Sequence, residues 1–438
     1  MKKHLPYWLL AVLLTITVTD MQAQTIAEEL TADVNRAAGI RYVHPTTTVW
    51  PDTPAPAGKQ PFYINHYGCP SAYYLERRDS YDAPYLTLAK ADSLGKLTPW
   101  GQDVLRRVAM VREDAQGRTA ELTSQGRTQS RALMRQRVER FPDVFTSEGY
   151  YSTHSIVLNH CIQTMNESMV QLSQLHQPLQ MNLKASHKDK PFMNPVDRSL
   201  EAERMDSQTK ARYDAFVDSN TDNTRLMASL FNDADYVSAH IDATALSRQL
   251  FVLAGSVQAS PLHEELTLYD IFLPEEIHRH WRCQNAYNYI RYGFCKLNGS
   301  HQPYLQRATL RNMMHMGDSV LKRQHPILHM RYTHEGVVMA LANLMELDGY
   351  NVATSNLDSL EHYGWADYRI APLGGSIEMI HYRRDRQDTD VLVKVLLNGH
   401  EARLPIASDC APYYHWNDVK RYYLRKLYRY ENSRRVKK

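Results

Sequence analysis

The sequence has no strong excess of charge of either sign, and this limits the classes of partner. Lysine and arginine outnumber the acidic residues by three among 438 residues. The clearest basic run, from Arg434 to Lys438, is short and terminal. Nucleic-acid-binding domains usually carry a clustered basic face, so we predict no nucleic-acid partner.

Long apolar runs are also scarce. Beyond the first two dozen residues, no stretch approaches the roughly 20 apolar residues that span a bilayer. The first run, from Leu9 to Val18, follows two lysines and precedes a small residue at Ala23. This order is typical of a secretory signal peptide, and we predict removal of residues 1–23 and a periplasmic or secreted protein without an integral membrane segment. A retained membrane anchor is the alternative.

Cysteine is sparse and its count is odd. The sequence has five cysteines, and none stands at a lipobox position after the apolar run, so a lipid-anchored form is not supported. In an oxidising compartment an odd number leaves at least one thiol unpaired. The sequence alone does not give the pairing of Cys69, Cys161, Cys283, Cys295 and Cys410.

Short catalytic motifs are missing as well. His334-Glu335 does not start a zinc-binding H-E-x-x-H helix, because Val338 stands at the second ligand position. His160-Cys161 is not a cysteine phosphatase loop, because Glu167 stands where that loop has its arginine. There is no Walker loop, G-x-S-x-G elbow or C-x-x-C pair. We therefore expect neither a metal ion nor a cofactor.

What the sequence does contain is a pattern of strands near both ends with helices between them. Residues 166–320 carry helical patterns, whereas strand-like runs lie on either side. This predicts an α/β core from residues 24–165 and 321–438 with an α-helical insert at 166–320. The strand-like runs are Phe62–His66, Ile327–Tyr332, Ile377–Tyr382 and Val391–Leu397, the last followed by an Asn398-Gly399 hairpin turn.

Two of these strands lead through a loop into a helix, one after His66 and the other at His334-Glu335. Open α/β sheets bind ligands at the carboxyl ends of their strands. The two junctions are therefore the predicted place for a functional site.

Nine segments in the same order resemble the histidine phosphatase superfamily, in its acid phosphatase, phytase and multiple inositol polyphosphate phosphatase branch. The resemblance covers nearly the whole mature chain and is weaker between about 180 and 310. It implies an α/β fold with a mostly parallel central sheet flanked by helices and an inserted α-helical domain. The segments are 61–68, 97–101, 121–126, 140–142, 161–165, 330–335, 347–350, 390–399 and 412–416.

The resemblance also implies a chemistry, phosphomonoester hydrolysis. In that family a histidine within an R-H-G-x-R motif takes the phosphoryl group, and arginines hold the phosphate oxygens. In this sequence Cys69 stands for the first arginine, Pro70 for the nucleophile and Tyr73 for the second arginine. Proline offers no nucleophile, so whether the chain is an enzyme stays open.

Other family positions are partly changed. His154 falls where a further phosphate-binding arginine is expected, and His160 replaces the arginine of an Arg-Cys pair. The family's later acid pair is retained as His334 and Glu335. The resemblance thus predicts a site that keeps its acid pair but lacks the nucleophile and most of the phosphate clamp.

Several interpretations of these residues stay open. His66 is a replacement nucleophile or a structural histidine, and Cys69 is a thiolate nucleophile or an ordinary buried or disulfide-paired cysteine. His334 and Glu335 bind a cation or a sugar hydroxyl, or they are present because the strand-to-helix junction packs around them. Tyr73, Tyr74 and His154 line an aromatic pocket suited to a neutral carbohydrate, or fill space.

Three functions follow from these alternatives. The first is a catalytically inactive pseudophosphatase that binds a partner or a small phosphorylated or polyol ligand. The second is an active acid phosphatase or phytase with another nucleophile, and the third is a different reaction at His334 and Glu335. Basic side chains converging on Pro70, with Arg77, Arg78 or Arg131 as candidates, would restore phosphate binding.

Overall fold

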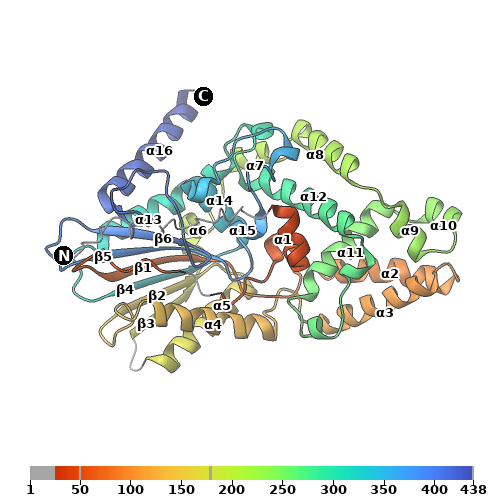
Figure 1. The fold of residues 1–438 in the computed structure, drawn as a ribbon, viewed down its shortest axis with the longest axis horizontal. Helices are drawn as coiled ribbons and strands as arrows, with labels where there is room; N and C mark the ends of the chain where they lie inside the picture. Colours follow the sequence, from red (N-terminus) through yellow and green to blue (C-terminus); the bar gives the residue numbers. More distant parts are fainter. Residues whose placement is uncertain (1–24, 49–50, 177–179, 437–438) are drawn as a thin grey trace, which may run out of the picture.

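The structure is a computed structural model that describes residues 25–48, 51–176 and 180–436. Its centre is one sheet in the order β3-β2-β4-β1-β5-β6-β7, with β8 paired to β6 (Figure 1). The strands are β1 (Gln60–Gly68), β2 (Tyr150–Ser155), β3 (Gln180–Ala185), β4 (Ile327–Tyr332), β5 (Ser376–Arg383), β6 (Leu392–Leu397), β7 (His400–Glu401) and β8 (Tyr414–His415).

The strand directions confirm the predicted mostly parallel central sheet. Neighbouring strands β3, β2, β4 and β1 are parallel, whereas β5 and β6 extend the sheet in antiparallel pairing. β1 lies between β4 and β5, so a strand from the first part of the chain is enclosed by two from the last part. The predicted strand at Ile327–Tyr332 coincides with β4.

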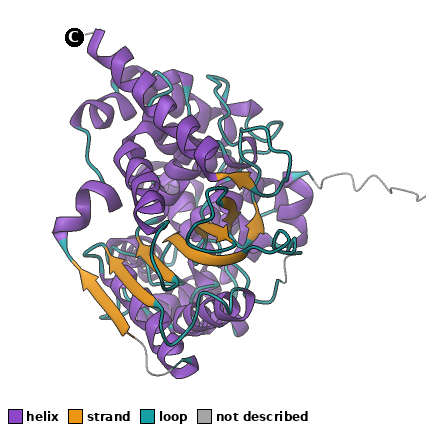
Figure 2. Ribbon diagram, turned by 90° about the vertical axis from the view of Figure 1, so that its left-hand side faces the viewer, coloured by secondary structure: helices purple, strands orange, loops and turns teal. Residues whose placement is uncertain are grey.

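Helices cover both faces of the sheet (Figure 2). α4 (Ser124–Arg140) and α5 (Asn159–Leu175) pack on one face through Met134, Met165 and their neighbours. α13 (Arg307–Val320), α14 (Glu335–Met345) and α16 (Trp416–Val436) contribute to the hydrophobic core of the other face. An α/β sandwich of this kind buries the central strand completely on both sides.

A helical layer lies beside the sheet, on the right of Figure 1. Its hydrophobic core joins helices of the middle of the chain to two earlier helices that lie before β2. These helices are α2 (Asp79–Ser93), α3 (Pro99–Asp114), α9 (Thr224–Leu230), α10 (Ala234–His240), α11 (Ala243–Val257) and α12 (Pro274–Tyr292); α8 (Ser207–Asn220) packs on α12.

Shorter helices connect the sheet to this layer. α1 (Ile26–Ala32) runs into a 3-10 segment, Val34–Arg41, and α6 (Lys190–Met193), α7 (Arg198–Arg204) and α15 (Asp367–Ile370) lie in later loops. β3 also falls within 166–320, where only helices were expected. It is an edge strand that pairs with β2 alone, so it lacks the continuous apolar run of a buried parallel strand.

The local sequence accounts for two helix starts and for the predicted hairpin turn. Thr98 caps α3 by accepting a hydrogen bond from the Gly101 amide, and Thr123 caps α4 through the Gly126 amide. Asn398 and Gly399 both have positive φ, 50° and 89°, and turn the chain between β6 and β7.

The predicted signal peptide at residues 1–23 lies outside the described residues. Among the residues that are described, no helix is both long and apolar enough to cross a bilayer.

Candidate functional site

The loop after β1 places Pro70 at the carboxyl end of the central strand. Backbone hydrogen bonds hold the loop on both sides: the Cys69 amide donates to the Gly375 carbonyl at 2.8 Å, and the Gly374 amide donates to the Pro70 carbonyl at 2.7 Å. The Ser71 amide donates to the Thr164 hydroxyl at 3.0 Å. The backbone at this position is therefore fixed, but its side chain carries no reactive group.

The His334-Glu335 junction lies directly beside this loop. β4 pairs with β1 in parallel, and the Thr333 amide donates to the Gly68 carbonyl at 2.9 Å. His334 then occupies the N-cap position of α14, and Glu335 is the first helical residue. The two predicted junctions thus meet at one edge of the sheet, where open α/β sheets bind ligands.

Tyr73 connects the two junctions. Its hydroxyl donates a hydrogen bond of 3.0 Å to Glu335 Oε1, and both side chains are buried. Burial raises the pKa of the Glu335 carboxyl above its usual range. The Tyr73 ring also stacks on the His160 ring, with centroids 4.1 Å apart and planes 13° apart. Tyr73, Glu335 and His160 therefore form one packed group.

Arg41 is the cation of this group, and sequence reasoning missed it. Its guanidinium donates to the Tyr73 carbonyl at 2.8 Å and lies 4.5 Å from the centroid of the Tyr73 ring. Burial opposes its charge, but the fields of Tyr73 and Glu335 prevail and raise the pKa of Arg41. Arg41 comes from the 3-10 segment after α1, and no sequence motif connects that segment to the site.

His334 lies in a more positive region. Its Nε2 lies 3.2 Å from the Asn194 side-chain oxygen. Burial, with the charge of Arg291 and further contributions from His160 and Arg204, lowers the pKa of His334 to about 4. The imidazole is therefore neutral at pH 7.

Arg204 and Arg291 approach from α7 and α12. Arg204 lies 6.0 Å, and Arg291 5.3 Å, from the centroid of the Tyr292 ring. Neither forms an ion pair with a carboxylate in the described part of the chain. Burial, together with the charge of Arg291, lowers the pKa of Arg204, although Tyr292 and Glu201 act in the opposite direction. The two cations therefore repel each other. An anion between them would relieve that repulsion.

The other residues that the sequence singled out lie away from this packed group or are unreactive. Cys69 is a buried free thiol whose pKa is raised well above its usual value by burial and by Glu335. His154 ends β2 with Nδ1 2.8 Å from Asp189 and Nε2 3.0 Å from the Ser152 hydroxyl, and it forms no contact with Tyr73. His66 is buried, and burial lowers its pKa to about 3. Its buried ring supports the structural interpretation.

The three arginines that could have rebuilt the clamp are engaged elsewhere. Arg77 pairs with Asp79 at 3.1 Å, and Arg78 pairs with Asp82 at 3.0 Å. Arg131 pairs with Glu167 at 2.7 Å. These distances leave Arg41 as the guanidinium that packs against Tyr73.

Tyr73 also fills the space at this end of the sheet. Cavities of about 380, 570 and 610 Å³ occur in the described structure, but none of the three is lined by Pro70, His160 or Glu335. A cavity that Tyr73 does line measures about 10 Å³, which is about the size of one water. Pro70, His160 and Glu335 line none of these four cavities.

Among the described residues, one group of three side chains is able to ligate a metal ion. It consists of Asp409, Cys410 and His415 and lies at the other end of the sheet, because His415 pairs with Leu392 at the start of β6. The end of β6, Leu397, pairs with Ile377 near Gly68. No such group surrounds Pro70 within the described ranges.

Comparisons with known proteins agree with the fold. No family model and no curated protein matches the sequence. The Bifidobacterium longum multiple inositol polyphosphate phosphatase in complex with phosphate matches with a TM-score of 0.72 and 12% identity, over 88% of this chain and 97% of that chain. Its complex with inositol hexasulfate matches with a TM-score of 0.69 and 13% identity, over the same shares of the two chains. The phytase from D. castellii matches with a TM-score of 0.65 and 12% identity, over 90% of this chain and 85% of that chain.

Proposed function

On the histidine acid phosphatase fold that this chain has, we propose a non-catalytic protein that binds a small anionic ligand or a partner. The observation that carries the proposal is Pro70 at the carboxyl end of β1, with Tyr73 packed across the adjoining space onto Glu335. Phosphoryl transfer through a covalent intermediate needs a side-chain nucleophile, and proline has none.

The neighbouring side chains are poor substitutes for that nucleophile. The raised pKa of Cys69 keeps its thiol protonated, and a thiol is far less reactive than a thiolate. His160 is neutral because burial and the charge of Arg41 lower its pKa to about 4, and its ring face is covered by Tyr73. His334 is held by Asn194. These constraints favour binding over catalysis.

Arg204 and Arg291 indicate the ligand. Guanidinium groups without carboxylate partners are suited to bind phosphate oxygens through charge-assisted hydrogen bonds. Both arginines lie close enough to His334 for their charges to lower its pKa. We favour a small phosphorylated polyol over a neutral carbohydrate, because neutral hydroxyls would leave the two charges uncompensated.

The second candidate is an active acid phosphatase or phytase that hydrolyses phosphomonoesters such as inositol phosphates. The retained His334 and Glu335 favour it, because the carboxyl of Glu335 has a raised pKa and could donate a proton.

The experiment that separates the two candidates is hydrolysis of a generic phosphomonoester and of inositol hexakisphosphate between pH 3 and 8. The chain should release no phosphate above the uncatalysed rate, whereas Pro70→His combined with Cys69→Arg and Tyr73→Arg should gain turnover. Far-UV circular dichroism verifies that the variant is folded. Hydrolysis by the natural chain at enzyme-like rates would overturn the proposal, and His160→Gln and His334→Gln would then locate the nucleophile.

Ligand binding is tested by calorimetric titration of the chain with inositol hexakisphosphate and, separately, inorganic phosphate. Arg204→Gln and Arg291→Gln should each weaken binding tenfold or more. Arg212→Gln removes an exposed arginine of the adjacent helix α8 and is the matched control. Equal loss in all three variants would indicate nonspecific attraction to positive charge.

Export to the periplasm or the exterior is part of the same proposal and rests on residues 1–23. Cell fractionation followed by amino-terminal sequencing should find a soluble chain that starts near Gln24. Recovery of the full-length chain in the membrane fraction would support the retained anchor instead.

A further inference from the structure

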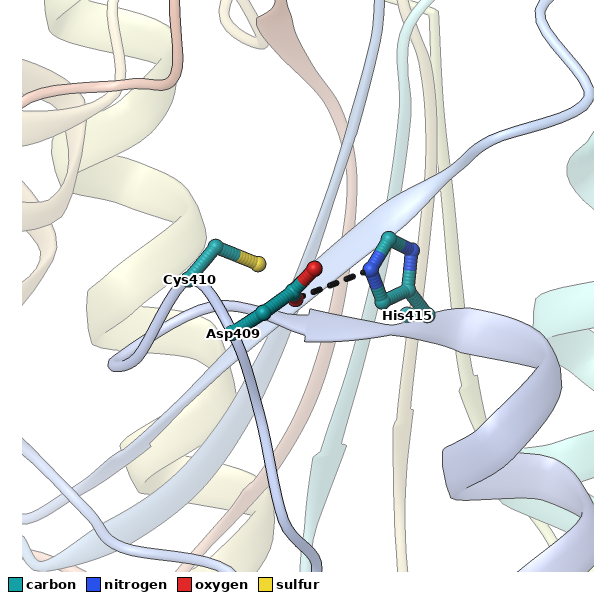
Figure 3. A group of neighbouring side chains, drawn as sticks. All are labelled: Asp409, Cys410 and His415. Carbon is teal, nitrogen blue, oxygen red and sulfur yellow. Dashed lines mark hydrogen bonds and ion pairs between the residues drawn. The ribbon is translucent and has the colours of Figure 1, made fainter.

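Three potential metal ligands converge beside the last helix, at the opposite end of the sheet from Pro70. Asp409 and Cys410 lie in the loop between β7 and β8, and His415 ends β8 just before α16. One oxygen, the sulfur and one ring nitrogen of these residues all lie within 4.8 Å of one another. Figure 3 shows the Asp409 carboxylate between the Cys410 sulfur and the His415 ring.

A second carboxylate orients the histidine. His415 Nδ1 lies 2.6 Å from Asp390 Oδ1, and His415 Nε2 lies 3.1 Å from Asp409 Oδ1. With the proton on Nδ1 donated to Asp390, the Nε2 lone pair is directed toward Asp409 and Cys410. Histidines that bind metals characteristically donate their other ring N–H to a carboxylate in this way.

The set of ligand atoms selects the class of metal. A thiolate, an imidazole nitrogen and a carboxylate oxygen together suit zinc, whereas magnesium and calcium prefer oxygen ligands alone. Zinc ligands at bond lengths of about 2.0–2.3 Å lie roughly 3.5 Å apart in a tetrahedron. The most widely separated of the three ligand atoms would therefore have to move about one ångström closer together. Asp409 is exposed and Cys410 is half-buried, so side-chain rotation can provide this movement.

We propose that Asp409, Cys410 and His415 bind one zinc ion, with Asp390 orienting His415. Binding replaces the thiol proton of Cys410 by the metal, and that proton is released to solvent. Water completes the fourth position on the side of exposed Asp409. The ion would attach the loop after β7 to the start of α16. Because the site lies at the opposite end of β6 from Pro70, it is independent of the proposed ligand-binding function.

The ion pairs already present do not explain why Asp409, Cys410 and His415 lie together. Lys59 is 2.8 Å from Asp388 and 3.5 Å from Asp390, so Asp390 has a cation besides His415. Among described cations, Asp409 pairs with His415 alone. The Cys410 sulfur contacts the Tyr413 carbonyl at 3.5 Å and the Ser408 hydroxyl at 3.6 Å, and it also has a hydrogen bond with the Asp409 side chain. A metal ion would replace these contacts of the sulfur and bind to the sulfur and the carboxylate together.

The test is titration of the reduced full mature chain with Co²⁺ and then Zn²⁺. Cobalt should give an ultraviolet absorption band from thiolate-to-metal charge transfer and visible bands typical of tetrahedral geometry, both saturating at one ion per chain. Zinc should displace the cobalt and abolish the bands, and competition with a coloured chelator gives its affinity. The absence of a thiolate band in the unaltered chain would overturn the proposal without any variant.

Substitutions identify which residues give rise to the thiolate-to-metal absorption band. Cys410→Ser should abolish it, and Asp390→Asn should keep it while weakening affinity about 10 to 100-fold. Cys283→Ser removes the other half-buried thiol and should leave the titration unchanged. A band that survives Cys410→Ser, or disappears with Cys283→Ser, would contradict the assignment.

Discussion

At the scale of single residues, the hydroxyl of Tyr73 is the clearest determinant of the site's electrostatics. It donates to the Glu335 carboxyl, which is buried and next to the stacked ring of His160. The family resemblance predicts an arginine of the phosphate clamp at this position. On that prediction, the tyrosine supplies a hydrogen-bond donor for the acid without the positive charge of an arginine.

Removing the Tyr73 hydroxyl should show how much the buried Glu335 carboxyl destabilises the folded protein. We expect Tyr73→Phe to lower the free energy of unfolding by about 1.5 to 3 kcal/mol at pH 7, because the Glu335 carboxyl loses the donor that stabilises its ionised form. The loss should shrink toward pH 4. Glu335 has a raised pKa when folded, so its burial destabilises the protein only where the unfolded carboxyl is ionised. Urea unfolding at both pH values measures the difference.

Tyr74→Phe is the matched control for this prediction. The Tyr74 hydroxyl contacts Asp114 at 3.3 Å and accepts from Arg118 at 3.1 Å. Its partners are partly exposed, so its loss should be smaller than that of Tyr73. An effect of Tyr73→Phe equal at pH 4 and pH 7 would mean that Glu335 is not the group concerned.

At the scale of elements, a buried ion pair joins helix α4 to strand β5. Arg137 and Glu378 are both buried and form two hydrogen bonds, of 2.6 and 3.0 Å. Burial alone would raise the pKa of Glu378, but the guanidinium outweighs it and lowers the pKa to about 2. The pair lies on the sheet face that α4 and α5 cover, close to His66.

Breaking this pair should be more harmful than replacing it. Arg137→Met should lower the free energy of unfolding by about 3 to 5 kcal/mol at pH 7, because Glu378 is left charged and buried. Because the folded pKa lies below the unfolded one, the pair stabilises fully above about pH 4.5, and this stabilisation is lost as the pH falls toward 2. Denaturant unfolding at pH 3 and pH 7 measures it.

The double variant Arg137→Met, Glu378→Met is the control for that experiment. It removes both charges and should recover most of the stability lost in Arg137→Met alone. A double variant as unstable as the single one would mean that packing at Arg137, and not the charge of Glu378, causes the loss.

At the scale of the whole molecule, the five cysteines are all free thiols. The odd count required at least one. Cys69, Cys161 and Cys295 are buried, whereas Cys283 and Cys410 are half-buried. The layers are thus held by apolar packing and hydrogen bonds.

This arrangement predicts how thiol reagents act on the native protein. Alkylation at pH 8.5 should modify at most two cysteines of the folded chain, Cys283 and Cys410, and all five after unfolding, as counted by mass spectrometry. A reductant should leave the thermal midpoint unchanged, because no crosslink restricts the unfolded chain. A midpoint that falls on reduction would show that disulfides form.

The sequence by itself determined the α/β class, the strand at 327–332 and the hairpin turn at Asn398-Gly399. The strand and the turn are local features, because a short apolar run and an Asn-Gly pair act within a few residues. The family resemblance also predicts that Pro70, Tyr73 and Glu335 stand at family positions. The roles assigned to those residues, and the division into residues 24–165, 166–320 and 321–438, stay predictions.

Only the tertiary structure decided which of these residues meet. Arg41 contacts Tyr73, and Arg204 and Arg291 come near enough to His334 to lower its pKa, from segments with no motif in common, because contacts between distant segments depend on how layers pack. Edge strand β3 escaped prediction because it pairs on one side only and none of residues 181–185 is buried, so its sequence has no apolar run. The sequence therefore predicts that Pro70 stands at the nucleophile position of the family, whereas the fold determined that Tyr73, Glu335 and His160 pack together.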